Sequence, residues 1–359
     1  MLTINTEQQH YDRLKEVKQF DDSKVGVKDL VDSGLTSIPR FFHHPPETLP
    51  AQPTTTSAPR TIPVVDLSES RSTVIEQIRR ASSTRGFFQI INHGFPQGSL
   101  DHIIAAMKDF NEQPTEIKAK YYHRELGSGA AFSSNFHLYH SKAASWRDTF
   151  QIRLAPNPPN QDSVPEVCRA AMPEWNREIG RLGEELMGLL SEGLGLITDR
   201  LKELSCLDVR VITSHYYPYC HQPDLTIGIS SHTNPGVLTV LLHNQINGLQ
   251  VKYSENDWVD VEPVSGALVI NIGDILQIIS NDECRSVEHR VLANPHLEAR
   301  VSIAVLCNPG IRENLYGPLP ELMSPEKPAV YHQFTLTDFM GRFFTKELDG
   351  KTLTNYYKL

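Results

Sequence analysis

No stretch of the 359-residue sequence approaches the roughly 18 consecutive apolar residues that a membrane-spanning helix requires. The first segment, residues 1–15, is polar and lacks the apolar centre of a secretion signal. Cysteine is scarce: the five that occur are scattered and never form a Cys-x-x-Cys pair, which excludes a zinc ribbon and argues against a disulfide framework. We therefore expect a cytoplasmic protein in a reducing compartment.

Basic residues are outnumbered, with 34 Lys and Arg against 43 Asp and Glu and a net charge of -9. A nucleic-acid partner usually requires a basic face, so this balance argues against one. The apolar share of 39% is that of an ordinary soluble globular protein. We expect a monomer that takes a small-molecule substrate and has neither a nucleic acid nor a membrane as partner.

Proline is concentrated between residues 39 and 59, where six prolines and residues 54–57 (TTTS) predict a linker without regular structure. Before this linker, residues 11–20 and 24–33 have the spacing of two short amphipathic helices. We therefore expect residues 1–60 to form an arm and linker more than a part of the core.

The rest of the chain changes texture near residue 206. Before that point, strand-like runs alternate with helical patterns. After it, short β-branched runs punctuated by Gly, Asn, Asp and Pro are typical of an all-β sandwich, barrel or jelly roll. We expect an α+β protein with strands at residues 61–66, 86–92, 209–217, 238–242, 249–251, 267–272 and 301–307, and helices at residues 72–83, 100–111 and 174–196.

Three features of the β-rich half carry chemistry. His232 and Asn234 are two residues apart, His289 lies further along, and Arg300 and Ser302 follow it. His-x-Asp, a distant His and then Arg-x-Ser is the sequence form of a two-His-one-carboxylate triad, which leaves open positions on Fe(II) for a co-substrate and oxygen. Residues two apart on a strand point to the same side, so positions 232 and 234 can reach one ion. Arginine offers a planar fork to a carboxylate, and serine adds a hydrogen bond.

The chain resembles the plant 2-oxoglutarate/Fe(II)-dependent dioxygenases nearly from end to end. Within them it is similar to the branch of 1-aminocyclopropane-1-carboxylate oxidase homologues, which includes deacetoxyvindoline 4-hydroxylase-like and benzoxazinone-hydroxylase-like enzymes. The motifs that carry the resemblance are residues 11–18 (YDRLKEVK), 21–28 (DDSKVGVK), 86–94 (GFFQIINHG), 146–150 (WRDTF), 215–218 (HYYP), 248–251 (GLQV), 271–274 (NIGD), 280–282 (SND) and 348–351 (LDGK).

The resemblance implies a double-stranded β-helix, or jelly roll, flanked by helices. The implied regions are an N-terminal arm and linker (1–60), a helical and strand region (61–205), the catalytic core (206–315) and a C-terminal helical lid (316–359). It also implies Fe(II) held by His232, residue 234 and His289, with ascorbate as reductant. The family couples decarboxylation of 2-oxoglutarate to hydroxylation, demethylation, desaturation or ring closure.

The resemblance further implies how ligands are held. The distal carboxylate of 2-oxoglutarate meets Arg300 and Ser302, and Tyr217 helps to position the co-substrate. Simpler interpretations stay open, because Arg300 is also compatible with a structural ion pair and Tyr217 with barrel filling. Family geometry places the first-half loop and the C-terminal helix over the barrel mouth, so the candidate substrate-binding residues are Phe136, Leu138, His215 and Phe339.

One position departs from the family pattern, because Asn234 stands where the metal-binding aspartate falls. A carboxamide oxygen can coordinate a cation but lacks the charge of a carboxylate. Three explanations remain open: an engineered substitution that traps a complex, a natural site that binds metal weakly, or a site repurposed for non-oxidative chemistry. A loop asparagine that bonds its own backbone and contacts no metal is a further alternative.

The leading hypothesis is an oxygenase that oxidises a small, largely apolar metabolite of plant specialised metabolism, such as an alkaloid. The first rival is a non-oxidative epimerase, cyclase or lyase on the same fold. There His232 and His289, if metal-free, would titrate near neutral pH, with Tyr217 and His215 as partners. The second rival is a binding protein that keeps the pocket without turnover.

Overall fold

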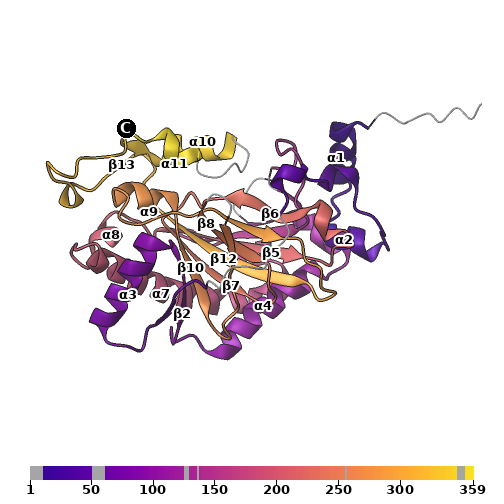
Figure 1. The fold of residues 1–359 in the computed structure, drawn as a ribbon. Coiled ribbons are helices and arrows are strands. Elements are labelled where there is room, and N and C mark those ends of the chain that lie inside the picture. The colour runs from indigo at the N-terminus through magenta and orange to yellow at the C-terminus, as the bar shows by residue number, and fades with distance from the viewer. Residues whose placement is uncertain (1–10, 51–60, 125–128, 136, 255–256, 346–351) are drawn as a thin grey trace, which may run out of the picture.

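The computed structural model describes residues 11–50, 61–124, 129–135, 137–254, 257–345 and 352–359. In these residues a large sheet runs through the middle of the molecule, with strand order β1-β2-β10-β7-β12-β5-β4-β3 (Figure 1). Its neighbouring strands are antiparallel except β1 and β2. The strands are β1 (Val64–Asp66), β2 (Phe87–Ile91), β3 (Ala130–Ser133), β4 (Asp148–Ala155), β5 (Val209–Tyr217), β7 (Leu238–His243), β10 (Leu268–Ile272) and β12 (Arg300–Asn308).

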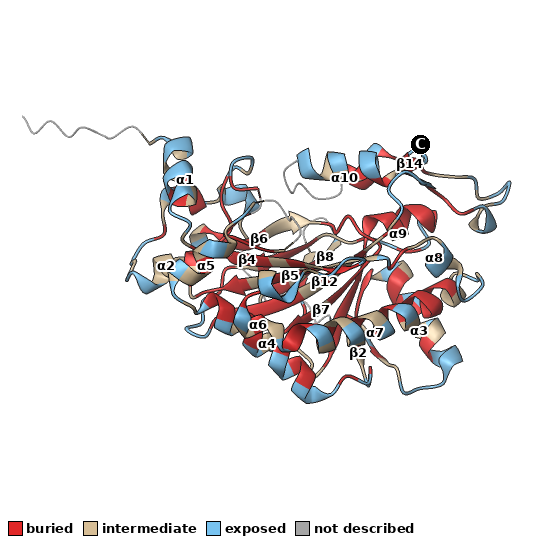
Figure 2. Cartoon of the chain, turned by 180° about the vertical axis from the view of Figure 1, so that it is seen from behind, coloured by how far each residue is buried: buried red, intermediate tan, exposed pale blue. Residues whose placement is uncertain are grey.

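Helices cover the outer face of the large sheet. The covering helices α3 (Arg71–Thr84), α4 (Gln97–Asn111) and α7 (Ala171–Gly193) turn their buried sides toward the strands, as Figure 2 shows. In α7 the apolar stripe recurs at helical spacing and is fully buried, so its burial fixes which side faces the sheet. The shorter helices on this part of the chain are α5 (Thr115–Lys118), α6 (Glu166–Arg169) and α8 (Arg200–Glu203).

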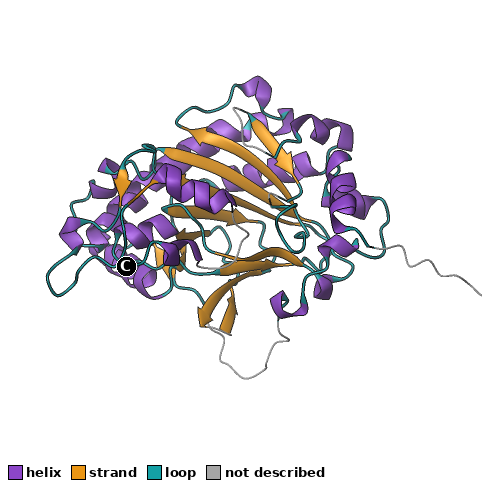
Figure 3. Cartoon of the chain, turned by 90° about the horizontal axis from the view of Figure 1, so that it is seen from above, coloured by secondary structure: helices purple, strands orange, loops and turns teal. Residues whose placement is uncertain are grey.

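A second, smaller sheet faces the inner side of the large one, and Figure 3 shows the two layers from above. Its order is β6 (Ile227–His232), β11 (His289–Leu292), β8 (Leu249–Ser254) and β9 (Asp257–Asp260). Phe87, Tyr217 and Val269 of the large sheet pack against Ile229 and Val291 of the small one. This pair of sheets is the jelly-roll core that the sequence predicts.

The N-terminal segment has a core of its own. The two predicted helices are present as α1 (Arg13–Asp22) and α2 (Val27–Asp32), which bury Val17, Phe20 and Val27. Phe20 and Phe42 pack near Trp146, which lies two residues before the start of β4. Residues 11–50 are therefore docked onto the strand region, whereas the predicted linker at residues 51–60 lies outside the described residues.

The C-terminal segment and α1 both lie above the sheets in the views of Figures 1 and 2, at opposite sides of the molecule. It contains β13 (Leu315–Tyr316), β14 (Phe334–Thr335), α10 (Leu336–Thr345) and α11 (Thr352–Tyr356). Beneath it lies α9 (Asp274–Ile279), whose residues are all buried. None of the described helices is long and apolar enough to cross a membrane.

Candidate active site

Two histidines lie side by side on two neighbouring strands of the small sheet, β6 and β11. His232 closes β6, His289 opens β11, and the antiparallel register places them directly opposite each other. Their ring centroids are 4.2 Å apart. Nδ1 of His232 lies 2.8 Å from the carbonyl oxygen of Ser230, and Nδ1 of His289 lies 3.2 Å from that of Val287. With Nδ1 donating to a carbonyl, Nε2 keeps the lone pair that binds a metal.

Burial keeps both rings uncharged. It lowers the pKa of His232 well below its ordinary value and that of His289 to about 4, because desolvation penalises the imidazolium. The expectation that these rings titrate near neutral pH in the metal-free protein is therefore wrong. Neutral imidazole is the form that ligates a metal, so this electrostatic environment suits a metal centre.

Asn234 lies beyond the end of β6, so the expectation that positions 232 and 234 share a strand is wrong. Its Nδ2 donates to Oγ1 of Thr239 on β7 over 2.8 Å, and its backbone oxygen accepts from the amide of Asp274 over 2.8 Å. These contacts leave the carboxamide oxygen to serve as a ligand. In the described part of the chain, no group of three or more His, Cys, Asp or Glu could hold a metal ion. The two imidazoles thus fit a ferrous site, and the carboxamide of Asn234 would be a weaker ligand than a carboxylate.

Strand register gathers the other predicted residues on the inner face of the large sheet. Antiparallel partners point to the same side, and alternate residues along one strand do too. Tyr217 pairs with Arg300, and His215 pairs with Ser302, so all four face the small sheet. On the far side of β12, His243 of β7 pairs with Ser302. The prediction that Arg300, Ser302 and Tyr217 lie together agrees with this register.

Arg300 is a buried guanidinium with no carboxylate within 4.0 Å among the described residues. Nε donates to the carbonyl oxygen of Ile246 over 3.2 Å, and Cζ lies 5.1 Å from the centroid of the Tyr217 ring. Burial raises the pKa of the Tyr217 hydroxyl, and the nearby Arg300 opposes this rise. Yet neither Nη1 of Arg300 nor the Tyr217 hydroxyl makes a hydrogen bond of good geometry within the described structure. A buried cation without a counter-ion fits an incoming carboxylate.

Arg147 is a second buried guanidinium that the sequence analysis did not single out. Asp148 pairs with Tyr216, so the preceding residue comes opposite Tyr217 and points into the space between the sheets. Nη1 donates to the carbonyl oxygen of Gly228 on β6 over 2.8 Å, and no described carboxylate lies within 4.0 Å of the guanidinium. A side chain at Gly228 would place its Cβ 2.9 Å from the Tyr217 ring, so this close approach requires glycine. The signal in the sequence was the motif at residues 146–150.

Of the four candidate substrate-binding residues, the structure describes Leu138, His215 and Phe339. Leu138 is fully buried among the N-terminal cluster, and Phe339 stacks on Phe334 and Tyr357 at centroid distances of 4.7 and 5.4 Å. His215 Nδ1 lies 3.1 Å from Oγ1 of Thr149. Phe136 and residues 348–351 lie outside the described residues. Substrate contact by these side chains stays a prediction.

A different pair links the loop after β3 to the C-terminal helix. His137 of the loop and Phe343 of α10 have ring centroids 6.4 Å apart in an edge-to-face arrangement. Burial, followed by the charge of Arg147, lowers the pKa of His137 to about 4. The loop after β3, α10 and the guanidinium of Arg147 therefore lie close together. The aromatic residues of the loop and of α10 were a signal in the sequence that these two segments contact each other.

Comparison with known proteins gives a consistent match. Residues 209–309 match the 2OG-Fe(II) oxygenase superfamily domain, and residues 62–175 match the N-terminal domain described as non-haem dioxygenase in morphine synthesis. Among curated relatives, 1-aminocyclopropane-1-carboxylate oxidase homolog 3 of Arabidopsis thaliana is 44% identical, covering 97% of this chain and 98% of that protein. Homolog 4 of the same organism is 45% identical, covering 96% and 98%.

Solved structures agree with the family match. The complex of JOX2 with 2OG, Fe and JA has a TM-score of 0.82 at 29% identity, covering 93% of this chain and 98% of that one. The 2-oxoglutarate complex of the Arabidopsis thaliana dioxygenase for auxin oxidation 1 has a TM-score of 0.63 at 25% identity, covering 75% and 100%.

Proposed function

The chain belongs to the 2OG-Fe(II) oxygenase superfamily, and we propose that it is a 2-oxoglutarate-dependent enzyme of the 1-aminocyclopropane-1-carboxylate oxidase homologue branch. Enzymes of this superfamily use Fe(II) and 2-oxoglutarate, typically with ascorbate as reductant. The proposed reaction is the oxidation of a small plant metabolite by hydroxylation, demethylation, desaturation or ring closure. The whole-length similarity to the plant relatives supports the branch.

The observation that carries this proposal is the unpaired guanidinium of Arg300 on the inner face, opposite the two histidines. Arg300 and Ser302 would hold the distal carboxylate of 2-oxoglutarate, and Tyr217 would pack against the co-substrate. His232, His289 and the carboxamide oxygen of Asn234 would hold the iron. When bound, the metal and 2-oxoglutarate supply the oxidising chemistry. The protein orients these ligands and excludes water with apolar walls between the sheets.

The charge of Arg147 bears on the substrate. An unpaired buried cation disfavours a second positive charge and favours an anionic or hydrogen-bond-accepting group. We therefore propose a small plant specialised metabolite that presents such a group toward Arg147, with the remainder of the molecule apolar. An alkaloid remains compatible where its nitrogen is uncharged or held away from Arg147.

Asn234 supports a second candidate function. Because the described residues hold no group of three ionisable ligands for a metal, the pocket also suits a non-oxidative epimerase, cyclase or lyase, or a binding protein without turnover. Product mass distinguishes these functions. A gain of one oxygen or a loss of CH2 supports the oxygenase, an unchanged mass supports an isomerase, and binding without conversion supports the silent protein.

The direct test of the leading proposal is 2-oxoglutarate binding, followed by turnover. Calorimetry under anaerobic conditions with Mn²⁺ should show saturable binding of one 2-oxoglutarate. Incubation with Fe(II), ascorbate, oxygen and plant metabolite fractions should then give succinate that depends on the fraction added. A protein that binds no 2-oxoglutarate with or without metal would refute the co-substrate site.

We also propose a cellular compartment, a class of partner and an oligomeric state for the protein. All five cysteines are buried free thiols, which supports a reducing compartment and hence the cytoplasm. The net charge of -9 supports a small-molecule enzyme without a nucleic-acid partner. We propose a monomer, which light scattering of the purified protein tests.

A further inference from the structure

His243 is a buried imidazole for which neither the family pattern nor the proposed function supplies a role. It ends β7, and its side chain is 5% exposed. Thr239 and Leu241 share its side of the strand, and they contact Asn234 and the core between the two sheets. His243 therefore points into the space between the sheets, away from the helices.

The ring lies beside the residues proposed to hold 2-oxoglutarate. Register places His243 directly opposite Ser302, and Arg300 is the next residue on the same face of β12. Burial, followed by the charge of Arg300, lowers the pKa of His243 to about 3. The imidazole is therefore neutral at physiological pH and has one N–H to donate.

One of the two ring nitrogens has no hydrogen-bond partner in the described protein. Nδ1 of His243 is buried, and no described group forms a hydrogen bond with it. Nη1 of Arg300, on the neighbouring strand, is in the same condition. Leaving such a buried group unsatisfied is costly, and the tautomer with the proton on Nδ1 would let His243 and Arg300 donate to one shared acceptor. A carboxylate fits, because its two oxygens accept about four hydrogen bonds.

We propose that His243 is a further binding residue for 2-oxoglutarate and donates from Nδ1 to the distal carboxylate held by Arg300 and Ser302. The inference rests on the proposed function, since it concerns the same co-substrate pocket. It adds a neutral donor from β7 to the charged donor and the hydroxyl from β12. The three side chains then select a ligand that ends in a carboxylate.

The test compares two ligands that differ only at the distal end. 2-Oxopentanoate has the five-carbon chain and the 2-oxo acid of 2-oxoglutarate, but a methyl group replaces the distal carboxylate. Calorimetry with Mn²⁺ under anaerobic conditions gives the Kd of each ligand. His243→Leu removes the donor, His243→Asn keeps an N–H near the position of Nδ1, and His102→Leu, at an exposed histidine of α4, is the matched control.

We expect His243→Leu to weaken 2-oxoglutarate about tenfold, the scale of one hydrogen bond to a charged group, while 2-oxopentanoate changes less than about twofold. His243→Asn should retain most of the affinity, and His102→Leu should match the parent. If the Leu variant does not fold, His243→Phe, which keeps a flat ring, provides the same comparison.

Two results would overturn the inference. Equal weakening of both ligands would assign His243 to packing, and unchanged binding of both would place the carboxylate elsewhere. A parent protein that binds neither ligand would instead refute the 2-oxoglutarate site itself. The failure of the inference and the failure of the proposed function are thus distinguishable.

Discussion

At the scale of single residues, position 234 would determine how strongly the proposed site holds a metal. A carboxylate brings a negative charge to a divalent ion, whereas the carboxamide of Asn234 brings only a dipole. The imidazoles of His232 and His289 are neutral and add no charge of their own. The proposed ligand set therefore has no anionic side chain, and 2-oxoglutarate would supply the negative charge.

Replacing Asn234 by Asp should restore that charge. We expect Asn234→Asp to bind more Fe(II) than the parent under matched anaerobic loading, because a carboxylate attracts the hard cation more strongly. With Fe(II), ascorbate and oxygen, the variant should also form succinate from 2-oxoglutarate faster. Metal analysis and mass spectrometry of succinate provide the two readouts. Equal iron content and equal succinate formation would show that the carboxamide is already a competent ligand.

Arg300 is the second residue with a defined expected effect. Arg300→Leu removes a charge-assisted contact, for which about 1.5–3 kcal/mol per hydrogen bond is the expected scale. Binding of 2-oxoglutarate should weaken at least tenfold, since 1.4 kcal/mol corresponds to that factor. Thermal-shift stabilisation by 2-oxoglutarate measures this directly. An undiminished shift in the variant would place the anchor of the distal carboxylate elsewhere.

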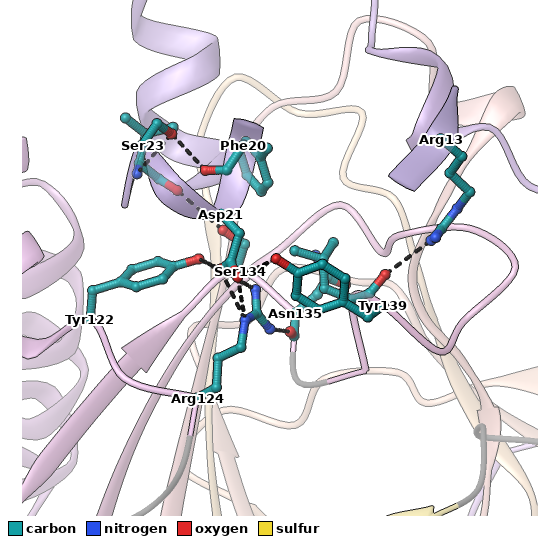
Figure 4. A network of polar contacts seen from close by, with 11 residues as sticks. Arg13, Phe20, Asp21, Ser23, Tyr122, Arg124, Ser134, Asn135 and Tyr139 are labelled. Carbon is teal, nitrogen blue, oxygen red and sulfur yellow. Dashed lines mark hydrogen bonds and ion pairs between the residues drawn. The ribbon is translucent and has the colours of Figure 1, made fainter. Parts of the chain in front are cut away.

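At the scale of elements, the carboxylate of Asp21 links α1 to the segments on both sides of β3 (Figure 4). Nε and Nη2 of Arg124 donate to Asp21 at 2.9 and 2.6 Å. The hydroxyls of Tyr122 and Tyr139 donate to the same side chain at 2.6 and 2.7 Å. Nη1 of Arg124 in turn donates to the carbonyl oxygen of Asn135 over 2.6 Å. The motif at residues 21–28 thus holds the segments on both sides of β3 against α1.

Asp21→Asn should destabilise this attachment by about 2 kcal/mol at neutral pH, the scale of a lost charged hydrogen-bond set that is partly exposed. Burial raises the pKa of Asp21, but hydrogen bonds from Arg124 and the two tyrosines outweigh it, so the net pKa is lowered. The stabilisation is therefore complete above the unfolded pKa of about 4 and is lost as the pH falls through the folded value.

Urea unfolding of parent and variant between pH 7 and pH 3 checks this expectation. The difference in unfolding free energy should stay constant near neutrality and narrow below about pH 4. Asp22→Asn is the matched control, because Asp22 pairs only with the exposed Lys18 on the helix surface. A control that loses as much stability as Asp21→Asn would contradict the assigned role of the network.

At the scale of the whole molecule, the N-terminal segment and the candidate site share one structural support. The buried carboxylate of Asp148 accepts hydrogen bonds from the backbone amides of Val27 and Lys28 at 2.7 and 2.9 Å. Burial raises the pKa of Asp148 to about 6, so this group depends on those donors. The preceding residue, Arg147, points to the opposite side, into the space between the sheets.

Removing residues 1–50 should therefore affect the site as well as the surface. We expect the truncated chain to have a lower Tm, because it exposes Trp146 and Leu138 and leaves Asp148 without its two backbone donors. Binding of 2-oxoglutarate should weaken, because the loss of the N-terminal contacts to Asp148 would shift the start of β4 and with it Arg147, which lies opposite Tyr217. Calorimetric Tm and 2-oxoglutarate Kd are the measurements. A truncated protein with the parent's Tm would show that the segment is only peripheral.

The sequence by itself determined much of the strand content and the chemical types at the site. The run at residues 209–217 is β5 without any change of bounds. The runs near β7 and β10 differ by one residue at one end and the run near β12 by one residue at each end, because alternating or continuous β-branched residues are a local signal. β6 and the buried helix α9 were missed, since Gly and Ser weaken the first pattern and uniform burial removes the periodicity of the second.

Only the tertiary structure decided which side chains share the inner face. Alternation along a strand shows that residues two apart point together, but it does not tell which strand lies alongside or in which register. Register placed Arg147 beside Tyr217 and His243 beside Ser302, across separations of more than fifty residues. The same packing buried Leu138 and Phe339 in apolar clusters, because the N-terminal and C-terminal segments dock over them. The sequence determined the chemical types of the side chains at the site, and long-range strand pairing determined which of these side chains lie together.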